Sequence, residues 1–373
     1  MPLTIAEEYR YSRHLVLPGV GVAGQEKIKK ARILLVGVGG LGSSAALYLA
    51  AAGVGTLGIA DDDVVDESNL QRQVIHRTST IGQLKVDSAA SAINEINPLV
   101  KVVTIPQRLT NDNAQELASD YDVIIDGTDN FSTRYLLNDV CVMLHKPLVF
   151  GSIYQFEGQV SVFDVDNGPC YRCLFPNPPQ PSTVPSCAEG GVLGVLPGLI
   201  GVLQATEALK LILGNGEPLR GRLLRVNAGA MRFQELRINK NPDCPICGAN
   251  KTITELQDYQ AFCGMAPAAG KDTPIEISAE DALAKIAKDE VTLLDVRDSV
   301  ELEENPSLAG AIHVPYSTFM RQMQRYNSVE NILIYCSTGI RSWQAVTLLR
   351  RSGFTRCWSV KGGLQALRAM EKE

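Results

Sequence analysis

The sequence predicts an α/β protein, with a doubly wound, mostly parallel sheet followed by a second, smaller α/β unit. Short apolar, β-branched strands alternate with helical segments through the first part of the chain. A glycine-rich turn follows the first strand and opens a helix. The composition changes over 250–274, after which strands and helices alternate again. We expect one domain over 1–249, a linker over 250–274 and a second domain over 275–373.

The elements of the first domain follow in chain order. Residues 1–30 have the pattern of polar-faced helices, and ARILLVGVGGLGSSAALYLAAAGVGTLGIADDD predicts a strand, a glycine turn, a helix and a second strand. KVDSAASAINEINP predicts a helix, and VKVVTIP, YDVIIDG and PLVFGSI predict strands. GQVSVFDV is a strand of more alternating type, FPNPPQPSTVPS is a long exposed loop, and LIGVLQATEALKLIL is an apolar helix.

Bulk properties exclude several classes of protein. The chain has 373 residues, a formal net charge of −6 and nine cysteines, with a pI near 5.4. The acidic balance argues against a nucleic-acid partner. No stretch reads as a membrane span, and the N-terminus lacks the apolar region of a secretory signal. Two C-x-x-C pairs without an export signal indicate thiol or metal chemistry in a reducing compartment. We expect a cytoplasmic protein with no membrane partner.

The first strand and its turn predict a nucleotide site. Gly37, Gly39 and Gly42 form G-x-G-x-x-G, with Gly40 between them, and the turn opens a helix. Glycines there allow phosphate to approach backbone N–H groups closely. Asp61 ends the next strand, where a carboxylate reaches a ribose hydroxyl in such folds. The alternative is a glycine-rich packing turn.

Charged residues after the later strands argue against a nicotinamide dehydrogenase. They are Arg72 and Lys85, with Asn69 and Gln73 beside Arg72, and then Asp126 and Asp129. Two cations and a carboxylate at the carboxyl edge of a parallel sheet suit a triphosphate and Mg²⁺, and hydride transfer has no need of them. A surface ion pair is the alternative for any one of these residues.

These motifs resemble the E1-like activating enzymes of the MoeB and ThiF group. The shared segments are GxGGLG, DxDxVxxSNLxRQ, GQxKV and DGTDNFxxR, from about Tyr9 to Cys247. Members adenylate the C-terminal glycine of a ubiquitin-like sulfur-carrier protein. The resemblance implies the following roles: Asp61 on the ribose; Asn69, Arg72 and Lys85 on phosphates; Gln73 supporting them; Asp129 on Mg²⁺; and Arg13, in RYSRH, reaching the site of a partner subunit. It therefore implies ATP, Mg²⁺ and a homodimer.

The cysteines divide into three groups. Two C-x-x-C pairs, Cys170 with Cys173 and Cys244 with Cys247, have the spacing of a closed structural Zn²⁺ site, with a redox pair as the alternative. Cys187, in PSCAEGGV, matches the crossover-loop cysteine of the resembled family and is a candidate nucleophile or acceptor, or else a spare thiol. Cys141 and Cys357 read as core, and Cys263 receives no role.

The stretch NILIYCSTGIRS predicts an activated thiol. An apolar strand ends on Cys336, and a loop of small residues leads to Arg341 at the start of a helix. Backbone N–H groups and the positive helix end favour thiolate there. The loop is one residue shorter than the corresponding loop of phosphatases, which suits a terminal sulfur better than a phosphate.

From residue 275 onward the chain resembles the rhodanese family. The resemblance rests on LLDVRD, AGAIHVP, CSTGIRS and VKGG, while NPSLAGAI departs from the usual G-H-I segment. It implies that Cys336 receives sulfur, that Arg341 orients the persulfide, and that Asp295 and Arg297 brace the loop. An inactive docking module is the alternative.

Together, these features predict an enzyme that adenylates the Gly-Gly terminus of a ubiquitin-like carrier and converts it to a thiocarboxylate with sulfur from Cys336. The donor would be a cysteine desulfurase or thiosulfate, and pterin-cofactor, thiamine, cysteine and tRNA thiolation are all possible pathways. Three other hypotheses stay open. They are adenylation alone with a docking tail or another sulfur acceptor, a nucleotide-sensing scaffold without turnover, and a dehydrogenase.

Overall fold

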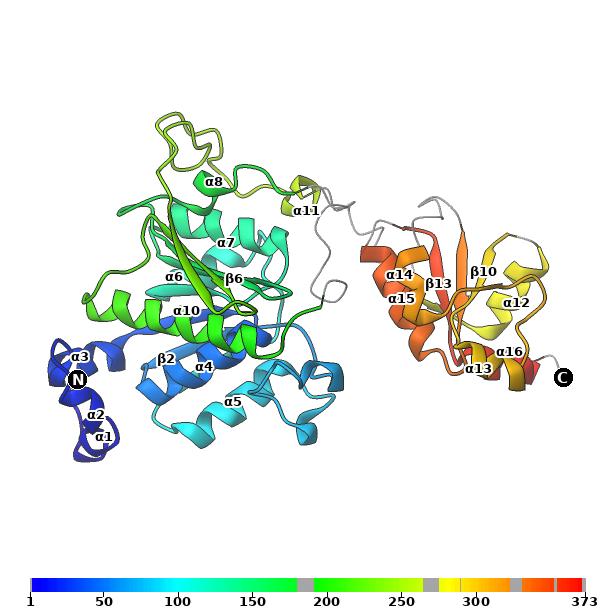
Figure 1. Cartoon of the computed structure of the whole chain (residues 1–373), viewed down its shortest axis with the longest axis horizontal. Helices are drawn as coiled ribbons and strands as arrows, with labels where there is room; N and C mark the ends of the chain where they lie inside the picture. The colour runs from blue at the N-terminus through cyan, green and yellow to red at the C-terminus, as the bar shows by residue number, and fades with distance from the viewer. Residues whose placement is uncertain are drawn as a thin grey trace. The chain divides into compact units, whose positions relative to one another are not determined.

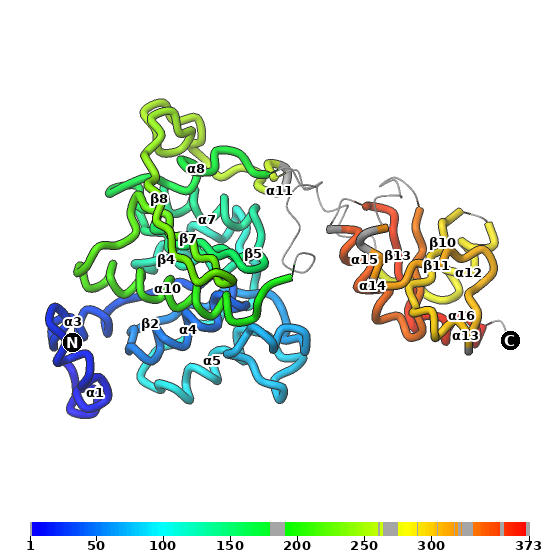
Figure 2. The backbone as a smooth tube through the Cα atoms, in the orientation of Figure 1, coloured from blue at the N-terminus to red at the C-terminus, as the bar shows by residue number. Residues whose placement is uncertain are grey.

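The computed structural model describes residues 2–179, 191–263, 275–288, 290–322, 331–351 and 354–370. The chain divides into two compact units, Met1–Tyr259 and Gln260–Glu373 (Figures 1 and 2). The first unit extends ten residues beyond the first domain expected from the sequence. Thr252 and Ile253 donate backbone hydrogen bonds to Pro245 O, so the beginning of the expected linker is folded against the first unit.

The first unit contains one sheet of eight strands in the order β3-β2-β1-β4-β5-β6-β7-β8. The strands are β1 Arg32–Val36, β2 Thr56–Ala60, β3 Lys101–Ile105, β4 Val123–Asp126, β5 Leu148–Tyr154, β6 Glu157–Phe163, β7 Arg222–Asn227 and β8 Arg232–Arg237. The first five pair in parallel and the last three antiparallel. The predicted doubly wound, mostly parallel sheet is confirmed, and β7 and β8 extend it beyond the strands expected from the sequence.

The helices of the first unit cover both faces of this sheet. They are α1 Ile5–Arg10, α2 Ser12–Leu15, α3 Gly21–Lys30, α4 Gly40–Ala52, α5 Lys85–Ile96, α6 Ala114–Ser119, α7 Phe131–Met143, α8 Tyr171–Leu174 and α10 Val195–Leu213. The β1–α4–β2 and β4–α7–β5 connections run in opposite directions along the sheet, so right-handed crossovers place α4 and α7 on opposite faces. Helices α5 and α10 pack with α4, α3 packs with α10, and α6 and α8 pack with α7.

Helix α10 corrects the expectation that no stretch of the chain has the length and composition of a membrane span. It is 19 residues long with a mean hydropathy of 1.4, so by length and composition alone it could span a membrane. It packs against α4, β5 and β6, and the amide of Gln204 is buried against Asp126 O at 2.7 Å. Because it covers the sheet as a core helix, its hydropathy is explained by burial in the protein.

The second unit has a five-stranded parallel sheet in the order β11-β10-β12-β13-β9. The strands are β9 Glu276–Ile277, β10 Thr292–Asp295, β11 Ile312–His313, β12 Ile332–Tyr335 and β13 Cys357–Val360, and the helices are α12 Ala279–Ala287, α13 Ser299–Glu304, α14 Tyr316–Gln322, α15 Ile340–Arg351 and α16 Gly363–Met370. A short helix, α11 Tyr259–Phe262, lies at the division between the units. Ser278 is the N-cap of α12, since its side chain accepts from Asp281 N.

The core of the second unit lies on both faces of its sheet. Leu294 and Ile334 belong to one hydrophobic cluster, and Leu293 and Leu333 belong to another. Alternate residues of β10 and β12 therefore enter opposite cores, as in parallel sheets covered on both sides. The carboxyl end of β12 leads into the loop that carries Cys336.

Candidate functional site

The glycine turn joins β1 to α4, and its geometry excludes larger side chains. Gly37 has a φ of 85°, in the region that favours glycine. A Cβ at Gly42 would lie 2.0 Å from Gly37 O, and one at Gly40 would lie 2.9 Å from Pro197 Cβ. The turn therefore stays compact, and the amino end of the 13-residue helix α4 is available to an anion.

Asp61 follows β2 and is tied to the glycine turn. Its Oδ2 accepts from Val38 N at 2.8 Å, and its Oδ1 accepts from Asp63 N at 2.9 Å. Burial raises the pKa of the carboxyl, although Lys85 and these two N–H groups act in the opposite direction. The structure thus holds Asp61 where the sequence predicts the ribose-binding carboxylate.

The two aspartates after β4 have different surroundings. Strands β1 and β4 are neighbours at which the chain direction along the sheet reverses, the place where α/β sheets bind ligands. Asp126 is fully buried and accepts from Arg134 Nε at 3.1 Å and Thr128 Oγ1 at 2.6 Å, so it supports the loop. Asp129 is exposed, with no polar partner among the described residues, which leaves its oxygens free for a cation.

The segment after β2 brings three predicted residues beside the turn. Asn69 is the last residue of a short 3-10 helix, and its Oδ1 accepts from the N–H of the capping residue Asp66 at 3.4 Å. Arg72 donates to Ser68 O at 3.1 Å. Gln73 is 5% exposed, and its Oε1 has no partner in the part of the chain described. A Cβ on Gly39 would lie 3.5 Å from its Nε2, so Gln73 lies against the turn.

Lys85 is the first residue of α5, and an exposed carboxylate only partly compensates its positive charge. Its side chain is 7% exposed, and its Nζ lies 2.9 Å from Asp63 Oδ2, whose side chain is 65% exposed. A buried ammonium with an exposed partner retains capacity for a second anion.

Two predicted residues fall outside this assembly. Arg13 lies on α2, is exposed and contacts none of the residues above within the described chain. Cys187 lies outside the described residues. Among the described residues, no contact places Arg13 at the nucleotide site.

His76 contributes to the site and was not singled out from the sequence. Its Nε2 lies 3.2 Å from Val38 O in the glycine turn, and its Nδ1 lies 2.9 Å from Ser88 Oγ on α5. Burial lowers the pKa of His76 to about 4, so the ring is neutral at pH 7. It links the turn to the helix that carries Lys85, and its only sequence signal was its position in QVIHR.

The four paired cysteines meet at one point. Their sulfurs lie 3.9 Å apart for Cys170 and Cys173, 3.6 Å for Cys170 and Cys244, and 3.4 Å for Cys173 and Cys247. Four sulfurs around zinc at about 2.3 Å would be about 3.8 Å apart. The donor set and its spacing therefore fit a tetrahedral Zn²⁺ site.

A buried ion pair supports this cysteine cluster. Arg172 lies between the first two cysteines and donates to Asp139 through Nε at 2.8 Å and Nη2 at 2.7 Å. Tyr259 Oη donates to the same carboxylate at 2.8 Å. The last residue of the first unit is thus fastened to α7 and α8 beside the cluster.

In the second unit, Cys336 follows β12 and is 1% exposed. Its Sγ accepts from Gly339 N at 3.2 Å and from Ser342 Oγ at 3.7 Å. Burial by itself would raise the pKa of the thiol, but hydrogen bonds from Ser342, Thr338 and Gly339 hold it below its ordinary value. The predicted stabilisation of the thiolate by the loop is consistent with this geometry.

Helix α16 buttresses the loop from behind. Leu364 N donates to Cys336 O at 2.7 Å. A Cβ on Gly363 would lie 2.3 Å from Cys336 O and 2.7 Å from Gly339 N. The VKGG segment is glycine-rich because the loop and the start of α16 approach so closely.

Arg341 is held by two carboxylates, Glu301 on α13 and Asp298, the residue that caps the start of α13. Its Nη2 lies 2.7 Å from Glu301 Oε1, and its Nη1 lies 3.2 Å from Asp298 Oδ2. Ser337 Oγ also donates to Glu301, at 2.6 Å. The hydrogen bond from Arg341 lowers the pKa of Glu301 to about 2. Arg341 was predicted from the sequence, whereas its two acidic partners, which come from a distant segment of the chain, were not.

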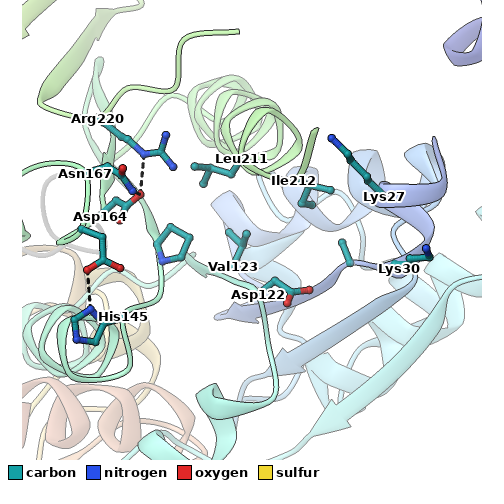
Figure 3. Close-up of a pocket in the computed structure, with 13 residues that line it drawn as sticks. Lys27, Lys30, Asp122, Val123, His145, Asp164, Asn167, Leu211, Ile212 and Arg220 are labelled. Carbon is teal, nitrogen blue, oxygen red and sulfur yellow. Dashed lines mark hydrogen bonds and ion pairs between the residues drawn. The ribbon is translucent and has the colours of Figure 1, made fainter. Parts of the chain in front are cut away.

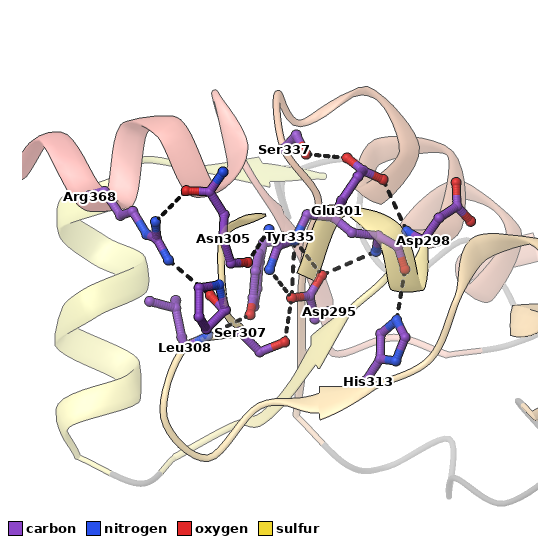
Figure 4. A network of polar contacts seen from close by, with 12 residues as sticks. Asp295, Asp298, Glu301, Asn305, Ser307, Leu308, His313, Tyr335, Ser337 and Arg368 are labelled. Carbon is purple, nitrogen blue, oxygen red and sulfur yellow. Dashed lines mark hydrogen bonds and ion pairs between the residues drawn. The ribbon is translucent and has the colours of Figure 1, made fainter. Parts of the chain in front are cut away.

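Figure 4 shows the polar network beneath this loop. Arg297 and Asp295 are 1% and 0% exposed, and the Arg297 guanidinium lies 5.9 Å from the ring centroid of Tyr335, the residue before Cys336. Ser307 Oγ donates to Asp295 at 2.8 Å, and Leu308 N donates to Tyr335 Oη at 2.9 Å. The segment NPSLAGAI, which departs from the usual family sequence, therefore joins the brace.

A different hollow, of about 570 Å³, lies at the amino edge of the first sheet, near Val123 at the start of β4 (Figure 3). Several of its charged side chains are already paired. Arg220 Nε donates to Asp164 at 2.7 Å, and His145 Nδ1 lies 2.7 Å from Asp166 Oδ1. It is at the opposite edge from the glycine turn and has none of the turn's phosphate-binding features.

Comparison with known proteins agrees with this geometry. The ThiF family matches residues 11–246, and the Rhodanese-like domain matches residues 278–370. The chain is 46% identical to the probable adenylyltransferase/sulfurtransferase MoeZ of Mycobacterium tuberculosis, over 98% of this chain and 93% of that protein. It is 52% identical to the sulfur carrier protein adenylyltransferase of Thermus thermophilus, over 71% of this chain and 100% of that protein.

Solved structures agree on the fold of the larger unit. The crystal structure of E. coli MccB superposes with a TM-score of 0.58 at 19% identity, covering 65% of this chain and 73% of that one. PaaA superposes with a TM-score of 0.55 at 25% identity, covering 64% of this chain and 76% of that one. At this level of identity the likeness to MccB concerns the fold alone.

Proposed function

Because this chain belongs to the ThiF family and carries a rhodanese-like domain at residues 278–370, we propose that it activates and sulfurates a ubiquitin-like carrier protein. The first unit adenylates the carrier's C-terminal Gly-Gly, and the second supplies sulfur that converts the acyl adenylate to a thiocarboxylate. The observation that carries the proposal is the presence, in one chain, of an anion-binding turn edged by cations and a buried thiol held by N–H donors.

The adenylation step places several negative groups together. The carrier carboxylate attacks the α-phosphorus of ATP, an O–P bond forms, and pyrophosphate leaves with the electron pair of the broken bond. The N–H groups at the start of α4, Arg72 and Lys85 would offset the repulsion. Asp61 would hold the ribose, while Asn69 and Gln73 would support the phosphates.

Two metal ions belong to the proposal. Asp129 offers exposed carboxylate oxygens of the kind Mg²⁺ prefers, and the ion would neutralise phosphate charge when bound. The four sulfurs fit Zn²⁺ with no position left for substrate, so that ion would be structural. Zinc would join Cys244 and Cys247 to Cys170 and Cys173 and would thereby fasten the end of the first unit to the rest of it.

Sulfur transfer begins at Cys336. Its thiolate attacks the sulfane sulfur of the donor and forms an Sγ–S bond. The leaving group is a cysteine thiolate when the donor is the persulfide of a cysteine desulfurase, and sulfite when the donor is thiosulfate. The terminal sulfur then attacks the acyl adenylate, and AMP leaves with the electron pair of the broken C–O bond. A second thiol reduces the resulting acyl disulfide, releasing the thiocarboxylate. Cys187 is an alternative carrier of the acyl group. The donor is a cysteine desulfurase or thiosulfate.

We further propose a homodimer in the cytoplasm. Helix α1 exposes Ile5 and Tyr9 to 87% and 86%, and Arg13 on the next helix contacts none of the nucleotide-site residues that the structure describes. This exposed apolar surface would bind a second copy of the chain, and Arg13 beside it would complete the nucleotide site of that copy.

The decisive experiment is ATP–pyrophosphate exchange with Mg²⁺ and a carrier protein ending in Gly-Gly. We expect exchange that depends on the carrier, followed by a mass increase of about 16 Da as sulfur replaces oxygen. Absence of exchange with every diglycine-ended carrier of the source cell would contradict adenylation. In Cys336→Ala we expect exchange to persist and the thiocarboxylate to disappear. Persistence of both would favour adenylation with a docking tail.

A further inference from the structure

Two serines, Ser342 and Ser359, take part in the hydrogen bonds beneath Cys336, and neither the family resemblance nor the related proteins assign them a role. Ser342, next to Arg341 on α15, has its Oγ 3.7 Å from Cys336 Sγ and 3.0 Å from Gly339 O. The same Oγ lies 2.9 Å from Ser359 Oγ on β13. Both serines are fully buried.

The direction of these hydrogen bonds follows from counting hydrogens. Each serine hydroxyl has one hydrogen to donate. Among the described residues, Ser359 Oγ has one hydrogen-bond neighbour, Ser342 Oγ. If Ser342 donated to Ser359, the hydrogen of Ser359 would be left unpaired in a fully buried position, which is unfavourable. Ser359 therefore donates to Ser342, and the hydrogen of Ser342 is left for Sγ or Gly339 O.

We infer that Ser359 and Ser342 form a hydrogen-bond chain that stabilises negative charge on Cys336 Sγ. Ser342 is a catalytic residue because it touches the reacting sulfur, and Ser359 is a positioning residue that acts through it. The inference deepens the proposed sulfur transfer and rests on it. The low pKa of Cys336, to which the Ser342 hydroxyl contributes, agrees with this assignment.

The chain responds to the charge that Sγ carries through the reaction. Before loading, Sγ is a thiolate and the Ser342 hydrogen points to it. When Sγ bonds to the sulfane sulfur and the donor's thiolate or sulfite leaves, Sγ becomes a neutral disulfide-type atom, and Gly339 O is the better acceptor. When a second thiol attacks Sγ, the bond to the outer sulfur breaks, its electron pair leaves with the thiocarboxylate, and Sγ stays neutral in a disulfide with that thiol. A further thiol then attacks the other sulfur of this disulfide, the electron pair of the broken S–S bond returns to Sγ, and Ser342 again donates to it.

Strand β13 supports a positional role for Ser359. In the sheet Ser359 is paired with Ile334 on one side and with Glu276 on the other. Because Ser359 is fully buried, an alanine would fill its position without a polar group to satisfy. A hydroxyl in that position needs a partner, and the partner it has is the residue that touches the reacting thiol.

The test measures the pH dependence of Cys336 alkylation by iodoacetamide in the full-length protein, located by peptide mass spectrometry. We expect Ser342→Ala to raise the pH midpoint by about one unit, since the hydrogen bond it removes favours the charged form. Ser359→Ala should raise it by less, and Ser359→Thr, which keeps the hydroxyl, should restore it. Cys357→Ala, also buried on β13, is the matched control and should not shift it.

Alkylation does not require adenylation or a carrier, so its outcome is distinct from failure of the proposed function. Tryptophan emission verifies that each variant is folded before titration. An unchanged midpoint in Ser342→Ala would overturn the assignment of that residue. A shift in Ser359→Ala no larger than that in Cys357→Ala would overturn the chain. Arg341, Glu301 and Asp298, the charged groups that pair with one another beside the loop, are the same in every variant.

Discussion

Arg297→Met should selectively destabilise the second unit. Arg297 donates to Asp295 through Nε at 2.9 Å and Nη2 at 2.6 Å, and to Asn305 O through Nη1 at 2.9 Å. Methionine keeps the packing but leaves the Asp295 charge buried beside the Ser307 hydroxyl and one N–H. Removing one partner of a buried ion pair costs about 3–5 kcal/mol. A domain has a free energy of unfolding of about 5–15 kcal/mol, so the loss is a large fraction of it.

The chain contains its own probe for this measurement. Its two tryptophans, Trp343 and Trp358, both belong to the second unit. Tryptophan emission in urea therefore reports the unfolding of that unit, and we expect the midpoint to fall by roughly 2 M for an m-value of about 2 kcal/mol/M. ATP–pyrophosphate exchange, which depends on the first unit, should stay unchanged.

A double-mutant cycle tests the cause of this loss. Asp295→Asn removes the charge that Arg297→Met leaves unpaired, so the double variant should be more stable than the sum of the single losses predicts. A single-variant loss below about 1 kcal/mol, which is typical of an exposed pair, would refute the argument from burial. Additive losses in the cycle would show that the two groups do not interact.

Three further predictions concern other parts of the chain. The pKa of Glu301 is lowered to about 2, so its carboxylate stabilises the fold above pH 4.5 and loses that effect as the pH falls towards 2. Because its side chain is 32% exposed, the contribution to the free energy of unfolding is about 1 kcal/mol. Glu301→Gln should remove this acid dependence, which is measured by tryptophan emission. Gly42→Ala should abolish ATP–pyrophosphate exchange because its Cβ would meet Gly37 O at 2.0 Å, whereas Gly198→Ala on α10, with nothing within 4 Å, should retain it; loss in both would implicate general instability. Cys247→Ser should lower zinc below one ion per chain by elemental analysis, and full occupancy would contradict the four-sulfur site.

Local sequence patterns were sufficient for the parts of the fold that form over short distances. The strand, turn and helix around Gly37 and the thiol loop at Cys336 each lie within one continuous segment, where glycine and small residues have direct geometric meaning. The N-cap at Ser278 is equally local. Each of these features needs few contacts from elsewhere in the chain, so its residues alone indicate it.

The features that were missed depend on distant contacts. Strands β7 and β8 form the free end of the sheet by pairing beyond β6, and β8 is exposed along its length, so it lacks the apolar run of a buried strand. Glu301 reaches Arg341 from 40 residues away in sequence. His76 is neutral because of burial, which its sequence neighbours do not reveal. Sequence pattern identified the reacting groups better than the groups that hold them.

Both sites lie at the start of a helix, but the cation beside each site is compensated to a different degree. At the glycine turn, Lys85 has one exposed carboxylate partner, so an arriving phosphate gains a cation. At Cys336, Arg341 has two carboxylate partners, so N–H groups and a hydroxyl carry much of the thiolate stabilisation. A thiolate stabilised more strongly would be a weaker nucleophile, since nucleophilicity falls with pKa. A sulfur atom that must attack and later leave in one cycle is therefore better served by neutral donors than by an uncompensated cation.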